Sequence, residues 1–123
     1  MMTKRKPTLL ATDIQPSQAT LSLRVDADIL DFSGHFPQFA LLPGVSQIDW
    51  AIFYACELLS TPDQFKGMEV IKFQEPILPD MEVTLTLNWD ADKQKLAFQY
   101  RSERDGHPEV HSSGKMKLGE RSD

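Results

Sequence analysis

The sequence is poor in features that define several classes of protein. It has a single cysteine, Cys56, among 123 residues, which excludes an internal disulfide. No uninterrupted apolar run approaches the ~20 residues of a membrane-spanning helix, and residues 1–7 lack the apolar segment of a secretion signal. We therefore expect a cytoplasmic protein without a membrane span. With no metal-ligand spacing around it, Cys56 is expected to pack in the core.

Positive charge is also in deficit. Lys and Arg number 13 against 18 Asp and Glu, so the formal net charge is -5. Proteins that bind nucleic acids need a basic face to displace counterions from phosphates. The sequence argues against that function, and an acidic partner would need a local basic patch. The cations available for such a patch are Lys66, Lys72, Arg101, Arg104, Lys115 and Lys117.

The rest of the composition is ordinary for a soluble globular domain. Hydrophobic residues make up 41% and charged residues 25%. A chain of this length is expected to form one domain and to bury roughly two-thirds of its unfolded surface. We predict a single domain over residues 1–123, with flexible ends at 1–7 and 119–123.

Periodicity predicts one helix and several strands. Residues 45–60 are apolar on nearly every side, which is typical of a buried helix about 24 Å long. Pro43 suits the first turn of that helix, and Asp105-Gly106 favours a tight hairpin turn. Alternating or apolar runs predict strands, and together these elements predict an α+β fold in which an antiparallel meander wraps around the helix. The predicted strands are residues 8–12, 20–26, 68–73, 83–89, 95–101 and 109–118.

One short stretch carries the groups needed for acid/base chemistry. His35 lies in a predicted loop, two residues before Pro37. Gly44 stands at the start of the predicted helix, and Asp49 lies within that helix. Neutral imidazole accepts protons near neutral pH, and the first amides of a helix favour negative charge. The stretch therefore combines a base, an oxyanion donor and a carboxylic acid.

The neighbours of Asp49 suggest how its carboxyl would behave. Val45, Ile52 and Phe53 are its helical neighbours at i-4, i+3 and i+4. Apolar surroundings penalise a carboxylate, so we expect a half-buried Asp49 whose pKa is raised. A structural carboxylate bonded to a neighbouring strand is the alternative.

Several motifs together resemble a known family. Gly34-His35-Phe36-Pro37, Leu42-Pro43-Gly44-Val45, Asp49 and the run IKFQEPILPD at residues 71–80 are similar to hotdog-fold 3-hydroxyacyl-[acyl-carrier-protein] dehydratases. The resemblance covers about residues 21–87. The interval of 14 residues from His35 to Asp49 (49 - 35) matches that of the family's catalytic pair. Residues 41–51 are closest to the short branch associated with aryl polyene lipid synthesis.

The resemblance implies a fold, a reaction and an assembly. It implies a hotdog domain that dehydrates 3-hydroxyacyl thioesters on an acyl carrier protein to trans-2-enoyl thioesters, with no cofactor and no metal. His35 and Asp49 would be catalytic, and the Gly44 amide would bind the thioester oxygen. It also implies a homodimer in which each site takes His35 from one subunit and Asp49 from the other. The acyl channel would be lined by Phe36, Phe39, Leu42 and Trp50, although such residues are more often core.

Two other functions remain open from the sequence. A hotdog acyl thioesterase would use the helix carboxylate to activate water and would not need His35. A non-catalytic subunit that binds the carrier protein would keep the fold without the chemistry. Acyl chain length and alkyl or aryl preference are not encoded in any motif.

The remaining titratable residues give weak signals. His107 and His111 have no metal-ligand partner at useful spacing, and both are expected at the surface. Asp26, Asp28 and Asp31 lack the glycine and distal glutamate of a calcium loop, so they are expected to be solvated. Tyr54 and Glu57 give the helix a limited polar surface that could meet a partner subunit.

Overall fold

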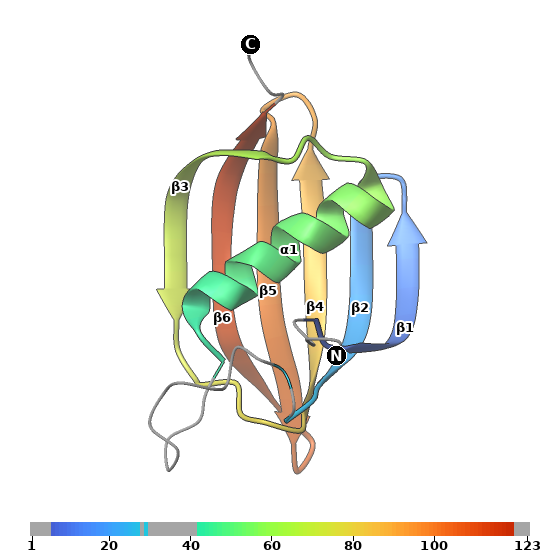
Figure 1. Cartoon of the computed structure of the whole chain (residues 1–123), viewed down its shortest axis with the longest axis vertical. Coiled ribbons are helices and arrows are strands. Elements are labelled where there is room, and N and C mark those ends of the chain that lie inside the picture. The colour runs from blue at the N-terminus through green and yellow to red at the C-terminus, as the bar shows by residue number, and fades with distance from the viewer. Residues whose placement is uncertain (1–5, 28, 30–41, 120–123) are drawn as a thin grey trace, which may run out of the picture.

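A computed structural model describes residues 6–27, 29 and 42–119. One helix lies across one face of a six-stranded antiparallel sheet, which confirms the predicted α+β class (Figure 1). The elements are β1 (Thr8–Gln15), β2 (Gln18–Val25), α1 (Gly44–Leu59), β3 (Gln64–Phe73), β4 (Met81–Asp90), β5 (Lys95–Arg104) and β6 (His107–Gly119). No helix in these described ranges is long and apolar enough to cross a membrane.

The sheet order is β1-β2-β4-β5-β6-β3, so the strands after the helix do not form a simple meander. β4, β5 and β6 are consecutive neighbours, but β3 pairs with β6 at the edge of the sheet. The predicted meander is therefore wrong for β3. Alternation in a sequence shows which face of a strand is buried, but it carries no information about which strand lies beside it.

Strand alternation builds the core. Leu21 and Leu23 of β2 lie opposite Leu85 and Val83 of β4, and all four side chains are buried. Trp50 of α1 is fully buried in the same cluster. The inner face of the sheet and the facing side of α1 thus form one hydrophobic core.

The outer side of α1 is not buried, contrary to the prediction of a helix enclosed on all sides. Val45 is 71% exposed and Phe53 is 41% exposed, and Asp49 and Glu57 lie exposed on the same side. The sheet covers only one side of the helix, and no second layer of this chain covers the other among the described elements (Figure 1). The outer side of α1 thus exposes apolar side chains at Val45 and Phe53.

Turns and ends follow the local sequence. Asp105 and Gly106 both have positive φ, at 52° and 79°, as a two-residue type I′ hairpin requires. Helix α1 ends at Ser60, which adopts a left-handed conformation with φ 55°. Pro7, just before β1, and Gly119, the last residue of β6, are both buried.

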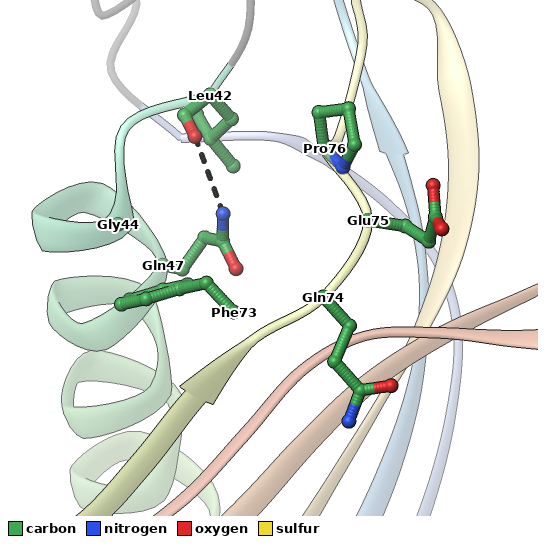
Figure 2. A pocket seen from close by; sticks show the side chains of 7 residues that line it. All are labelled: Leu42, Gly44, Gln47, Phe73, Gln74, Glu75 and Pro76. Atoms are coloured by element: carbon green, nitrogen blue, oxygen red, sulfur yellow. Dashed lines mark hydrogen bonds between the residues drawn. The ribbon is translucent and has the colours of Figure 1, made fainter.

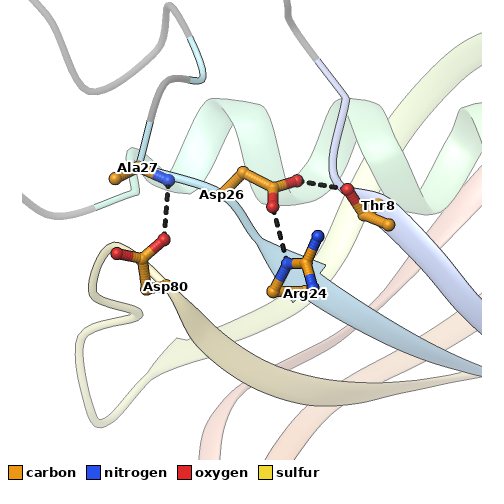
Figure 3. Close-up of polar contacts among 5 residues, drawn as sticks. All are labelled: Thr8, Arg24, Asp26, Ala27 and Asp80. Carbon is orange, nitrogen blue, oxygen red and sulfur yellow. Dashed lines mark hydrogen bonds and ion pairs between the residues drawn. The ribbon is translucent and has the colours of Figure 1, made fainter.

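An ion pair between exposed Arg24 and buried Asp26 lies at the end of β2 (Figure 3). Asp26 is 8% exposed, so the prediction that it is solvated is wrong. Its carboxylate accepts hydrogen bonds from Thr8 Oγ1 at 2.5 Å and Arg24 Nε at 2.7 Å, and Asp26 raises the pKa of Arg24. Nearby, Asp80 accepts a bond from the Ala27 amide at 3.1 Å. These bonds tie β1, β2 and the β3–β4 connection together at the point where the chain leaves the sheet toward the His35 segment.

Candidate active site

The start of α1 has no side chain to cap it. Pro43 is the N-cap residue and makes no side-chain capping bond, and the first turn contains no acidic residue. The first amides of a helix have no acceptor within the helix, and they carry the positive end of its dipole. The N-terminus of α1 is therefore suited to an anion or a developing oxyanion.

A cavity of about 270 Å³ opens at this helix start (Figure 2). Gly44 lines the cavity from α1, and Phe73 lines it from the end of β3. A Cβ added to Gly44 would lie 2.5 Å from the Phe73 ring, so the ring packs directly against the glycine. The absence of a side chain at Gly44 thus lets an aromatic ring, or a ligand in its place, approach the backbone. The full lining is Leu42, Gly44, Gln47, Phe73, Gln74, Glu75 and Pro76.

A buried polar network holds the helix start in place. Gln47 is buried, and its side-chain amide donates to the Leu42 carbonyl at 3.2 Å (Figure 2). Ser112 of β6 donates to Gln47 Oε1 at 2.6 Å, and Tyr100 of β5 donates to the Gln47 carbonyl at 2.7 Å. Buried polar groups satisfied in this way fix one arrangement. This network was not predicted from the sequence, although a glutamine within an apolar helix is a signal for it.

Tyr100 allows a test of this network by pH. Burial raises the pKa of its phenol well above 10, and nearby Tyr54 and Asp49 raise it further. The unfolded chain releases this proton near pH 10.0 while the folded chain retains it, so rising pH favours unfolding. We expect the free energy of unfolding in urea to fall as the pH rises above 10. We expect a smaller fall in Tyr100→Phe, with Tyr54 supplying the remainder because burial also raises its pKa. An equal fall in the free energy of unfolding of the wild type and of Tyr100→Phe would show that folding does not raise the pKa of the Tyr100 phenol.

Asp49 lies on the exposed side of α1, between Val45 and Phe53, and not in the lining of the cavity. The expectation of a half-buried carboxylate is wrong for the single chain, because the apolar neighbours at i-4 and i+4 face outward with it. Asp49 follows Gly44 by five residues, a rise of about 7.5 Å along the helix. The carboxylate and the Gly44 amide therefore lie on one helix, little more than one turn apart.

The other predicted site residues divide into three groups. Leu42 lines the cavity beside Gly44, as the channel prediction requires. Trp50 is fully buried in the core, and the cavity lining does not include it. His35, Phe36 and Phe39 lie outside the described residues, so their roles stay predictions.

The remaining candidates do not form a metal site. Among the described residues, no group of three or more His, Cys, Asp and Glu side chains could hold a metal ion. Cys56 is only half buried, with its thiol 3.6 Å from the Pro62 carbonyl. His107 is exposed as predicted, but His111 is buried, so the prediction of a surface His111 is wrong.

Lysines gather on the sheet face away from α1. The Lys95 ammonium group lies 2.9 Å from the Glu69 carboxylate. The hydrogen bond from Lys95 is the main cause that lowers the pKa of Glu69, and the positive charges of Lys115 and Lys117 also lower it. Met116 and Leu118 alternate with these lysines and are buried on the helix side. The cluster of Lys95, Lys115 and Lys117 therefore faces away from the cavity. Lys72 instead directly precedes the cavity-lining residue Phe73 in β3.

Comparison with solved structures defines the class of the fold. An uncharacterised protein from Erwinia carotovora subsp. atroseptica is 39% identical, with a TM-score of 0.84 and coverage of 94% of this chain and 97% of that one. The dehydratase heterocomplex ApeI:P from Xenorhabdus doucetiae contains a chain 38% identical, with a TM-score of 0.81 and coverage of 91% and 96%. The chain therefore has the hotdog fold, as the dehydratase of that heterocomplex does.

Sequence comparison gives the family. A family model for the ApeI dehydratase matches residues 11–115, and the chain belongs to this ApeI-like family. The 3-hydroxyacyl-[acyl-carrier-protein] dehydratase FabZ of Polynucleobacter necessarius subsp. necessarius (strain STIR1) is 28% identical over 119 residues, covering 86% of this chain and 79% of that protein. Residues 11–115, the range that the family model matches, include the His35 segment, Gly44 and Asp49.

Proposed function

We propose that this chain dehydrates 3-hydroxyacyl thioesters on an acyl carrier protein to trans-2-enoyl thioesters, in aryl polyene or fatty acid synthesis. The observation that carries the proposal is the cavity at the uncapped start of α1, where the absence of a side chain at Gly44 lets a group pack against the backbone. The ApeI-like family and the similarity to FabZ support the same reaction.

The proposed chemistry assigns one task to each group. His35 removes the proton from C2 of the substrate, and the Gly44 amide donates a hydrogen bond to the thioester oxygen as negative charge develops there. Asp49 donates a proton to the C3 hydroxyl, which leaves as water while the C2–C3 double bond forms. His35 as base and Asp49 as acid therefore act at the adjacent carbons C2 and C3, while the Gly44 amide binds the thioester oxygen.

The exposed side of α1 supports an assembly that completes the site. Val45 and Phe53 leave apolar surface on both sides of Asp49, and a second subunit covering it would desolvate the carboxyl. We propose a homodimer in which each active site combines His35 of one subunit with Asp49 of the other. The solved relative from Xenorhabdus doucetiae is in a heterocomplex, so a different subunit is the second candidate for this place.

Hydration of a crotonyl thioester, the reverse reaction, tests the proposed function. We expect the conjugated enoyl absorbance to fall when enzyme is added, with no release of free thiol. Release of thiol without hydration would identify a thioesterase. A protein that assembles correctly, binds the carrier and catalyses neither reaction would be a non-catalytic subunit, and the dehydratase proposal would be wrong.

A further inference from the structure

One buried histidine lies behind the cavity wall and has no part in the proposed chemistry. His111 is 1% exposed. It lies at a bulge in β6, where Tyr100 pairs with Ser112 and Arg101 pairs with Val110. A bulge inserts an extra residue into a strand and redirects its side chain.

The His111 ring is held on both sides. Nδ1 lies 3.2 Å from the Glu75 carbonyl oxygen, and Nε2 lies 2.7 Å from Ser102 Oγ. A carbonyl oxygen can only accept, so Nδ1 carries the proton and donates a hydrogen bond to the backbone carbonyl of Glu75. In the neutral ring Nε2 then accepts from the Ser102 hydroxyl. The imidazole therefore links β5 to the connection between β3 and β4.

The main chain of His111 binds the same connection. Its carbonyl accepts the amide of Gln74 at 2.9 Å and the amide of Glu75 at 3.3 Å. Residues 74–76 belong to no strand, so their backbone groups need partners from elsewhere. Three hydrogen bonds with His111 satisfy the Gln74 amide and both backbone groups of Glu75.

The segment held by His111 separates two cavities. Glu75 and Pro76 line the cavity of about 270 Å³ at Gly44, and they also line a second cavity of about 130 Å³. Leu78 and Met81 give the second cavity apolar surface, and His111 itself forms part of its wall. Displacement of residues 74–76 toward the second cavity would deepen the first.

We propose that His111 is a positioning residue that sets the depth of the acyl cavity by fixing residues 74–76 between these two spaces. The inference rests on the proposed function, because it takes the cavity at Gly44 as the place for the acyl chain. Each additional methylene buried against apolar surface strengthens binding roughly fourfold, so a deeper cavity favours longer acyl chains. His111 thereby determines chain-length selectivity without touching the reacting carbons.

Two matched variants isolate the bond to Glu75. His111→Asn places an amide donor near the position of Nδ1 and retains that bond. His111→Gln fills more of the space but places its amide near Nε2, toward Ser102, and loses the bond to Glu75. For crotonyl, 2-octenoyl and 2-dodecenoyl thioesters, we expect His111→Gln to raise the ratio of kcat/KM for the longest to the shortest substrate by about tenfold. The change should lie in KM, with kcat for the crotonyl substrate altered by less than about threefold. His111→Asn should keep the wild-type ratio.

Two measurements without turnover separate this inference from the proposed function. We expect the Gln74 and Glu75 amides to exchange hydrogen faster in His111→Gln than in His111→Asn. We also expect calorimetry with saturated acyl-pantetheine thioesters to show the same shift toward longer chains. A shift in binding from a protein that hydrates no enoyl thioester would refute the dehydratase proposal and leave this inference standing. Equal exchange and equal chain-length preference in the two folded variants would overturn the inference.

Discussion

Asp49→Asn is expected to lower crotonyl-thioester hydration by about 100-fold or more. A positioned acid or base typically contributes ~10²- to 10⁴-fold, and asparagine cannot supply the proton that converts the C3 hydroxyl into water. The loss should appear in kcat, since the amide has nearly the same shape as the carboxyl group. Steady-state rates followed by enoyl absorbance measure it directly.

Glu57→Gln is the matched control for Asp49→Asn. Glu57 lies two turns further along α1, on the same exposed side of the helix. Each of the two substitutions thus replaces a carboxyl group by an amide on the same helix face. Glu57 is about 12 Å from Asp49 along the helix axis, so it has no part in the proposed proton transfers, and we expect Glu57→Gln to stay within about twofold of wild type. Equal activities for Asp49→Asn and Glu57→Gln would show that Asp49 is not the proton donor.

Gly44→Ala carries the second large expected effect. The new Cβ would lie 2.5 Å from Phe73 Cζ and 2.9 Å from Cε1, so it must displace the ring. Phe73 is 53% exposed, which gives the ring room to move without unfolding the chain. The methyl group would also stand where the thioester must approach the amide. We expect a loss of about 10²- to 10³-fold in kcat/KM, the size of a lost oxyanion donor.

The double variant Gly44→Ala/Phe73→Ala separates the two effects of that methyl group. Phe73→Ala removes the ring with which the new Cβ collides, so the cavity regains its space. If the methyl group blocks the thioester itself, the double variant stays as slow as Gly44→Ala, while Phe73→Ala alone loses far less. Recovery of activity in the double variant would mean that displacement of Phe73 caused the loss, and that the Gly44 amide is not the donor.

Local patterns in the sequence predicted the elements well but not their environment. Leu21, Leu23, Val83 and Leu85 alternate with polar residues, and each is buried as the pattern predicted. The exposed side of α1 could not be predicted, because helical periodicity does not show how many layers cover a helix. β3 was misplaced for a related reason, since pairing depends on the path of the chain after α1 and not on the strand itself.

The candidate site was predictable only in its local parts. The Pro43-Gly44 helix start was evident from residue types, and the structure places Gly44 and Leu42 in one cavity. The burial of His111 depends on a bulge in β6 and on a segment 36 residues earlier in the chain, so no local pattern indicates it. The contacts of Gln47 with Tyr100 and Ser112 are equally remote in sequence.

Mixing two inactive variants tests the central claim that His35 and Asp49 from different subunits form one site. His35→Ala and Asp49→Asn homodimers should each be nearly inactive. After subunit exchange at equal amounts, half of the dimers are mixed and each mixed dimer has one intact site, so activity should rise to about a quarter of wild type. No rise in activity, with mixed dimers verified by mass spectrometry, would contradict the shared site.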